Sequence, residues 1–88
     1  MLFRSGNVLQ AQGKVDEAIG SYRKALELQP GDAEAHNNLG SALRARGRME
    51  ESEASYREAL AINPGYAEAY NNLGVVLQEQ GKIGRAHV

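Results

Sequence analysis

Two stretches of this chain decide its fold: Ala-Glu-Ala-His-Asn-Asn-Leu-Gly at residues 33–40 and Ala-Glu-Ala-Tyr-Asn-Asn-Leu-Gly at residues 67–74. They lie 34 residues apart, and the surrounding segments 30–47 and 64–81 agree at most of their positions. A repeat of this length is typical of helical solenoids, in which each unit buries its apolar face against a neighbour. We therefore expect an all-α protein that presents a surface and is not an enzyme.

Apolar side chains recur at helical spacing in five segments, which predict helices at 2–12, 15–28, 33–46, 49–62 and 67–80. Asp32 is placed to cap the third of these helices, and Gly47 is placed to end it in the left-handed conformation. The connections are too short to reach anything but the adjacent segment. Successive helices should therefore form antiparallel hairpins, with a first turn at Gly13.

Three glycines, Gly6, Gly40 and Gly74, recur at one repeat position inside these helices. A glycine within a helix costs about 1 kcal/mol relative to alanine, so its recurrence indicates close packing that leaves no room for a Cβ. We expect the facing helix to present Ala25 and Ala59.

The composition excludes several functions. The chain contains no cysteine, which rules out disulfides and thiolate chemistry. Acidic and basic residues are mixed to a net charge of −1, which gives no electrostatic footprint for nucleic acid. No apolar run approaches the roughly 18 residues that a membrane span requires. We expect a cytoplasmic protein without cofactor, metal, nucleic-acid or membrane partner.

Both ends interrupt the repeat. Residues 2–5 and 82–88 can be encoded by complementary DNA sequences that resemble a widely used sequencing adapter. We therefore expect residues 1–5 and 83–88 to be foreign to the natural protein, and that protein to continue in both directions. The encoding DNA would test this.

The recurring residues resemble the tetratricopeptide repeat over residues 6–82. The second repeat meets its pattern with His36, Leu39, Gly40, Leu43, Tyr56, Ala59 and Pro64, although Ser52 stands where alanine is usual. The resemblance implies antiparallel helix pairs, A and B, that stack into a right-handed superhelix, here with about five helices. Repeat 1 would span 6–32, repeat 2 33–66, and helix A of a third repeat 67–82.

By this resemblance, the A helices would line a concave groove that binds an extended peptide or a partner protein, as in a scaffold or adaptor. Paired asparagines recur in the A helices, and an asparagine side chain offers an acceptor and two donors to a peptide backbone. They would form a ladder along the peptide. The peptide-binding residues that we predict are Asn7, Asn37, Asn38, Ser41, Arg44, Asn71, Asn72 and Gln78.

Other interpretations stay open. The asparagines could instead bond to neighbouring helices. The chain also resembles the repeat arm of O-linked N-acetylglucosamine transferases and of bacterial relatives, which would make it a substrate-presenting arm whose catalytic domain lies elsewhere. The family's two-carboxylate clamp for a chaperone peptide is disfavoured, because Phe3, Glu68 and Asn72 occupy its basic positions.

The third repeat has a helix A and no helix B in this sequence. Leu73, Val76 and Leu77 should therefore lose the helix that would cover them. We expect the chain to be marginally stable or to self-associate through its fifth helix, and a sharp melt independent of concentration would contradict this.

Overall fold

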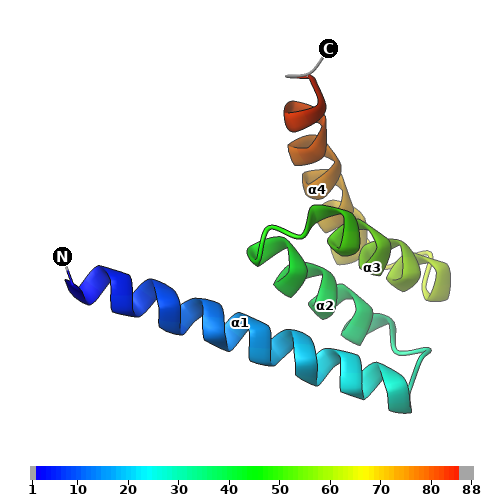
Figure 1. Cartoon of the computed structure of the whole chain (residues 1–88). Helices are drawn as coiled ribbons and strands as arrows, with labels where there is room; N and C mark the ends of the chain where they lie inside the picture. Colours follow the sequence, from blue (N-terminus) through cyan, green and yellow to red (C-terminus); the bar gives the residue numbers. More distant parts are fainter. Residues whose placement is uncertain (1, 86–88) are drawn as a thin grey trace.

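The computed structural model describes the backbone of residues 2–85 and the side chains of residues 12–81. Within that range the helices are α1 (Leu2–Leu28), α2 (Ala33–Ala45), α3 (Met49–Ile62) and α4 (Ala67–Arg85). Figure 1 shows α1 and α2 packed side by side in opposite directions, with α3 and α4 following. This is the all-α, stacked-hairpin architecture that the repeat predicts.

The turn expected at Gly13 does not form. α1 continues through Gly13, so that the two helices expected at 2–12 and 15–28 are one. α4 likewise continues through Gly81 to Arg85. Glycine adopts right-handed helical and left-handed backbone angles about equally readily, so it permits a helix to continue as well as to end. The described residues therefore form four helices where the sequence pattern indicates five.

The predicted ends of α2 are confirmed. A carboxylate oxygen of Asp32 accepts a hydrogen bond from the amide of Ala35 at 3.1 Å, which caps the start of the helix. Gly47 has a φ of 81°, and the next amide, that of Arg48, donates to the carbonyl of Leu43 at 2.9 Å. This pattern satisfies a carbonyl at the helix end and turns the chain into α3.

The core consists of two apolar clusters, each between neighbouring helices. The first joins α1 to α2 and the second joins α3 to α4. Their buried members are Ile19, Leu39 and Leu43 in the first, and Tyr56, Leu73 and Val76 in the second. Each helix thus buries one stripe against its neighbour, which is how stacked repeats share a core.

α2 and α3 pack closely together at Gly40. A Cβ added to Gly40 would lie 2.6 Å from an atom of the Tyr56 ring. The predicted close packing is therefore confirmed at Gly40, although the facing side chain is a tyrosine and not an alanine. At Gly74, one repeat later, a Cβ would meet no atom within 4 Å.

The two expected alanine partners differ in the same way. Ala59 on α3 is fully buried, whereas Ala25 on α1 is exposed. The difference follows from the straight course of α1 (Figure 1), because none of the described helices folds back over Ala25. Gly6, the glycine expected to face Ala25, lies outside the residues whose surroundings the structure describes.

The expectation of uncovered side chains on α4 holds only in part. Leu73 and Val76 are buried, at 8% and 0% exposure, because they pack against Tyr56 of α3. Leu77 is 41% exposed. α3 therefore covers two of the three residues, and only Leu77 is left open.

Candidate peptide-binding surface

Two polar contacts hold α2 and α4 next to each other. The Asn72 amide donates to the Asn37 side-chain oxygen at 3.1 Å, and the Arg44 guanidinium donates to the Glu79 carboxylate at 2.7 Å. Each contact joins residues that are 35 positions apart. The two helices therefore share a surface, and we predict that it includes the residues expected from the sequence to bind a peptide. We call it the α2–α4 face and define it by Asn38, Ser41, Arg44, Asn71, Asn72 and Gln78.

The asparagines differ in exposure. Asn37 is 1% exposed, so its side chain serves the contact between helices. Asn38 and Asn72 are half-buried, and Asn71 is exposed. The bond between Asn37 and Asn72 fits the alternative interpretation for that pair. Asn72 nevertheless keeps its side-chain oxygen and a second N–H for other partners.

The other predicted residues are placed as follows. The hydroxyl of Ser41 lies 2.9 Å from that of Tyr56, which ties α2 to α3. Arg44 is exposed, and its hydrogen bond with Glu79 raises the pKa of the Arg44 guanidinium. Gln78 is exposed. The Asn7 side chain lies outside the described ones, so its peptide-binding role stays a prediction.

Tyr66, which the sequence analysis did not single out, lies next to Asn37 at the start of α4. Burial raises the pKa of the Tyr66 hydroxyl. The negative charges of Glu68 and Glu34 raise it further, and a hydrogen bond with Asn37 opposes the rise. Tyr66 occupies the repeat position of Asp32, so the repeat pattern gave no signal for an aromatic residue here.

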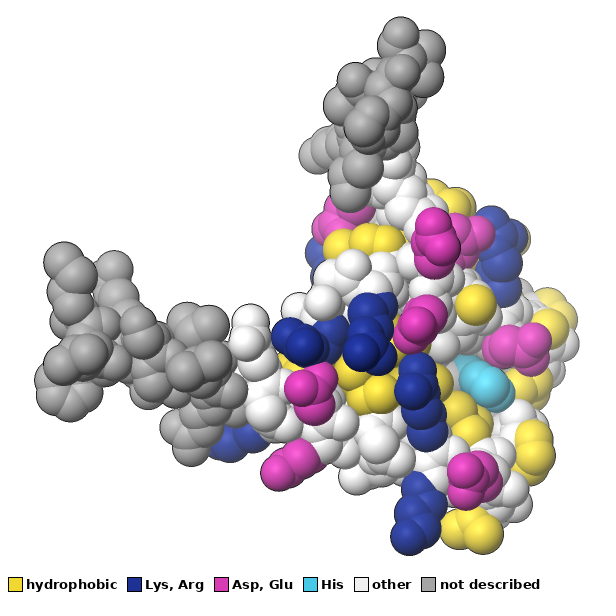
Figure 2. Space-filling view, viewed as in Figure 1, with side chains coloured by type: hydrophobic (Ala, Val, Ile, Leu, Met, Phe, Trp, Pro, Cys, Tyr) yellow, Lys and Arg dark blue, Asp and Glu magenta, His cyan; other side chains and the backbone are white. Residues whose placement is uncertain are grey.

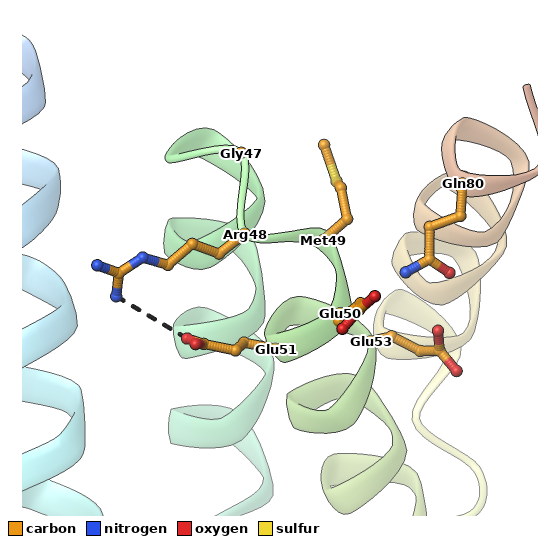
Figure 3. Close-up of a pocket in the computed structure, with 7 residues that line it drawn as sticks. All are labelled: Gly47, Arg48, Met49, Glu50, Glu51, Glu53 and Gln80. Atoms are coloured by element: carbon orange, nitrogen blue, oxygen red, sulfur yellow. Dashed lines mark ion pairs between the residues drawn. The ribbon is translucent and has the colours of Figure 1, made fainter. Parts of the chain in front are cut away.

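Two hollows in the surface are lined by none of the predicted residues. One is lined by Gly47, Arg48, Met49, Glu50, Glu51, Glu53 and Gln80, and Figure 3 shows Gln80 of α4 facing the first turns of α3. Another lies further along the same two helices and includes Leu60, Tyr70 and Leu73. Both therefore follow the seam between α3 and α4. The sequence gives no signal for this seam, because a run of glutamates at a helix start is typical of a solvated surface.

The surface carries no block of one charge in the view shown. Figure 2 shows basic and acidic side chains interspersed over this face of the molecule. No cluster of metal-ligating side chains occurs among the described residues. None of the helices described between residues 2 and 85 is both long and apolar enough to cross a membrane.

Comparisons with known proteins agree with this arrangement. Two family profiles, each described as a tetratricopeptide repeat, match residues 3–67 and 55–88. A search of curated proteins found no match. Among solved structures, the chain is similar to the first TPR of Spaghetti (RPAP3), bound to the HSP90 peptide SRMEEVD. The two are 30% identical with a TM-score of 0.76, over 94% of this chain and 68% of that one. Because the first profile alone spans most of the sequence, the chain belongs to the tetratricopeptide repeat family.

Proposed function

We propose that this chain is a protein-interaction scaffold that binds an extended peptide across the α2–α4 face. Asn38, Asn71 and Asn72 would pair with the peptide backbone, while Gln78 and Arg44 would contact its side chains. Asn37 would act through Asn72, because its buried oxygen accepts the Asn72 amide and fixes the orientation of that side chain. Asn7 would extend the row along α1.

The observation that carries this proposal is the register between α2 and α4. The contacts Asn37–Asn72 and Arg44–Glu79 hold the two helices next to each other, which supports a site where polar side chains of both helices contact one peptide. An extended peptide has one donor and one acceptor per residue, and the amides of this face can pair with both. Binding of this kind is compatible with many peptide sequences, because its hydrogen bonds go to the peptide backbone.

The resemblance to a domain that binds an HSP90 peptide supports a peptide ligand in general. It does not support an acidic one. Glu68 is exposed on the first turn of α4, where the carboxylate clamp described above has a lysine, and Glu34 is exposed on the first turn of α2. We propose that these carboxylates repel acidic peptides and favour neutral or basic ones.

A peptide array followed by fluorescence anisotropy tests the binding face. We expect the peptides selected by the wild-type chain to lose about tenfold or more in affinity for the double variant Asn38→Ala with Asn72→Ala, since two hydrogen bonds are removed. Glu58→Ala, a change of an exposed residue on α3, is the control and should bind as the wild type does. Equal binding by wild type and double variant would refute the asparagine ladder.

A charge reversal tests the selectivity. Glu68→Lys should raise the affinity for an acidic peptide such as SRMEEVD several-fold at low salt, and the gain should shrink as salt is added. Glu58→Lys carries the same change on α3 and should leave that affinity unaltered. An acidic peptide that binds the wild-type chain more tightly than a neutral peptide of the same length would contradict the proposal.

Catalysis is not part of this proposal. Tetratricopeptide repeats are typically protein-binding modules, and none of the comparisons favours a glycosyltransferase arm. Assaying the chain for glycosyl transfer together with its flanking coding sequence would decide that alternative.

A further inference from the structure

Tyr66 precedes α4 as Asp32 precedes α2, but its side chain has a different partner. The Tyr66 carbonyl accepts a hydrogen bond from the Tyr70 amide at 3.1 Å. The Asp32 carbonyl accepts the same bond from the His36 amide at 3.2 Å, so both residues take the N-cap position. The Asp32 carboxylate caps its own helix, whereas tyrosine is not among the side chains that cap helices. Tyr66 instead bonds to Asn37 of α2, and such a departure from local preference is expected at functional sites.

Asn37 joins Tyr66 to Asn72 through both of its polar atoms. The Asn37 side-chain oxygen accepts the Asn72 amide at 3.1 Å. The hydrogen bond between Asn37 and Tyr66 opposes the rise in the pKa of the Tyr66 hydroxyl, which is the effect of a donor on the phenolic oxygen, so the Asn37 amide donates. Asn37 is 1% exposed, and a buried amide needs partners for its oxygen and its N–H groups. The three side chains therefore form one hydrogen-bond chain between α2 and α4.

The two ends of this hydrogen-bond chain offer complementary groups. The half-buried Asn72 keeps its side-chain oxygen, which is an acceptor. The half-buried Tyr66 keeps its own O–H, which is a donor, because its oxygen accepts from Asn37. Burial, followed by the charges of Glu68 and Glu34, raises the pKa of the Tyr66 hydroxyl, so it stays protonated at neutral pH. One acceptor and one donor match one N–H and one C=O of an extended peptide.

We propose that Tyr66 is a further peptide-binding residue of the α2–α4 face, whose hydroxyl donates a hydrogen bond to a backbone carbonyl of the bound peptide. The Asn72 oxygen would accept a backbone N–H of the same peptide, and the buried Asn37 would hold both side chains in place. This inference rests on the proposed function, because it assigns a donor to the same face. It adds a residue that the repeat pattern does not mark, since Asp32 occupies the equivalent position before α2.

The charges near Tyr66 determine which carbonyl its hydroxyl can bind. After burial, the negative charges of Glu68, Glu34 and Asp32 raise the pKa of the Tyr66 hydroxyl, so these carboxylates lie near enough to act on it. They would repel the C-terminal carboxylate of a peptide, whereas the carbonyl of an internal peptide bond carries no net charge. Tyr66 should therefore favour a segment inside a chain over a free C-terminus. Amidation of a selected peptide should leave its affinity unchanged or raise it, and a loss of affinity would contradict this preference.

Fluorescence anisotropy with a peptide selected by the wild-type chain tests the role of Tyr66. Tyr66→Phe removes the hydroxyl alone, and we expect an affinity loss of about three- to tenfold. Tyr70→Phe is the matched control, because it makes the same change at a tyrosine of α4 that is 63% exposed and lines the hollow between α3 and α4. It should bind as the wild type does. Equal binding by Tyr66→Phe and the wild type would overturn the proposal.

The asparagine variants separate this inference from the proposed function. If the double variant Asn38→Ala with Asn72→Ala loses affinity and Tyr66→Phe does not, only the role of Tyr66 is wrong. If neither loses affinity, the peptide binds elsewhere and both proposals are wrong. Circular dichroism should show the same helix content in Tyr66→Phe, Tyr70→Phe and the wild type.

Isotope-edited infrared spectroscopy tests the contact itself. The selected peptide is made in a series of forms, each with a different backbone carbonyl isotope-labelled. One labelled carbonyl should absorb at a lower frequency on the wild-type chain than on Tyr66→Phe, because a hydrogen bond donated to the oxygen weakens the C=O bond. Tyr70→Phe should give the same spectrum as the wild type. If no labelled carbonyl distinguishes the wild type from Tyr66→Phe, the hydroxyl does not bind the peptide backbone and the proposal is overturned.

Discussion

Single side chains decide how closely the helices of this chain approach each other. Tyr56 is 1% exposed and rests on the bare backbone of Gly40, while Ser52, fully buried beside it, donates a hydrogen bond to the Gly40 carbonyl at 2.6 Å. The serine that departs from the repeat pattern thus has a partner, which removes the cost of burying its hydroxyl. Gly40 on α2 and Ser52 on α3 together let α2 pack closely against Tyr56.

The two glycines of this repeat position should respond differently to substitution. Gly40→Ala should destabilise the chain, since overpacking of about 1–3 kcal/mol exceeds the gain of about 1 kcal/mol in helix propensity. Gly74→Ala should leave the stability of the monomer unchanged or raise it by up to about 1 kcal/mol, because its surroundings are open. Urea unfolding at a concentration where the chain is monomeric measures both. A Gly40→Ala variant as stable as Gly74→Ala would contradict the close contact.

The bond between Asn37 and Asn72 should appear as an energetic coupling. A double-mutant cycle with Asn37→Ala and Asn72→Ala should give a coupling of about 0.5–1.5 kcal/mol in the free energy of unfolding. Asn71→Ala, at an exposed position, should change stability by less than about 0.5 kcal/mol. If the effects of the two single substitutions on the free energy of unfolding add to within about 0.5 kcal/mol, the two side chains do not interact.

The asparagines also show that the exposure of a single residue could not be predicted from the repeat pattern. Asn37 and Asn71 occupy one repeat position and have identical neighbours on the C-terminal side, yet one is buried and the other exposed. α4 packs beside Asn37, whereas no described helix takes that place beside Asn71. The repeat pattern could identify the positions of the face, but the exposure of each residue depends on the neighbouring helix.

At the scale of helices, three glycines at the same repeat position differ in whether a helix ends there. Gly47 ends α2 in the left-handed conformation, while Gly13 and Gly81 continue their helices. The extent of α3 and the cap at Asp32 could be predicted, because they depend on local pattern. The burial of Leu73 and Val76 could not, because it depends on how α4 packs against α3. Whether a glycine turns the chain depends on packing after the turn: Tyr56 and Ala59 of α3 become buried when α3 folds back.

The straight course of α1 predicts a long distance between its ends. Spin labels at Ser5→Cys and Lys24→Cys should be separated by about 28 Å, given a rise of 1.5 Å per residue over the intervening segment. The chain contains no native cysteine, so labelling is specific. Labels at Lys14→Cys and Lys24→Cys lie in the second part of α1 and give a reference of about 15 Å. A separation near 10 Å for the first pair, as between packed helices, would show a hairpin at Gly13.

At the scale of the whole molecule, the chain presents two kinds of surface. The α2–α4 face is polar and carries the proposed peptide site, whereas the seam between α3 and α4 carries the two hollows. The domain boundaries, with foreign residues at 1–5 and 83–88, stay a prediction that the encoding DNA would test. The fold itself could be predicted from the 34-residue period, because repeats of this length bury their apolar residues by stacking against neighbouring repeats.

The most direct test of the proposed function is a nuclear magnetic resonance titration of the labelled chain with a peptide selected from the array. We predict that the largest shift changes occur in the side-chain amides of Asn38, Asn71 and Asn72 and in the backbone of α2 and α4 around them. Shift changes confined to α1 and α3, or the same changes in the double variant Asn38→Ala with Asn72→Ala, would contradict binding at the α2–α4 face.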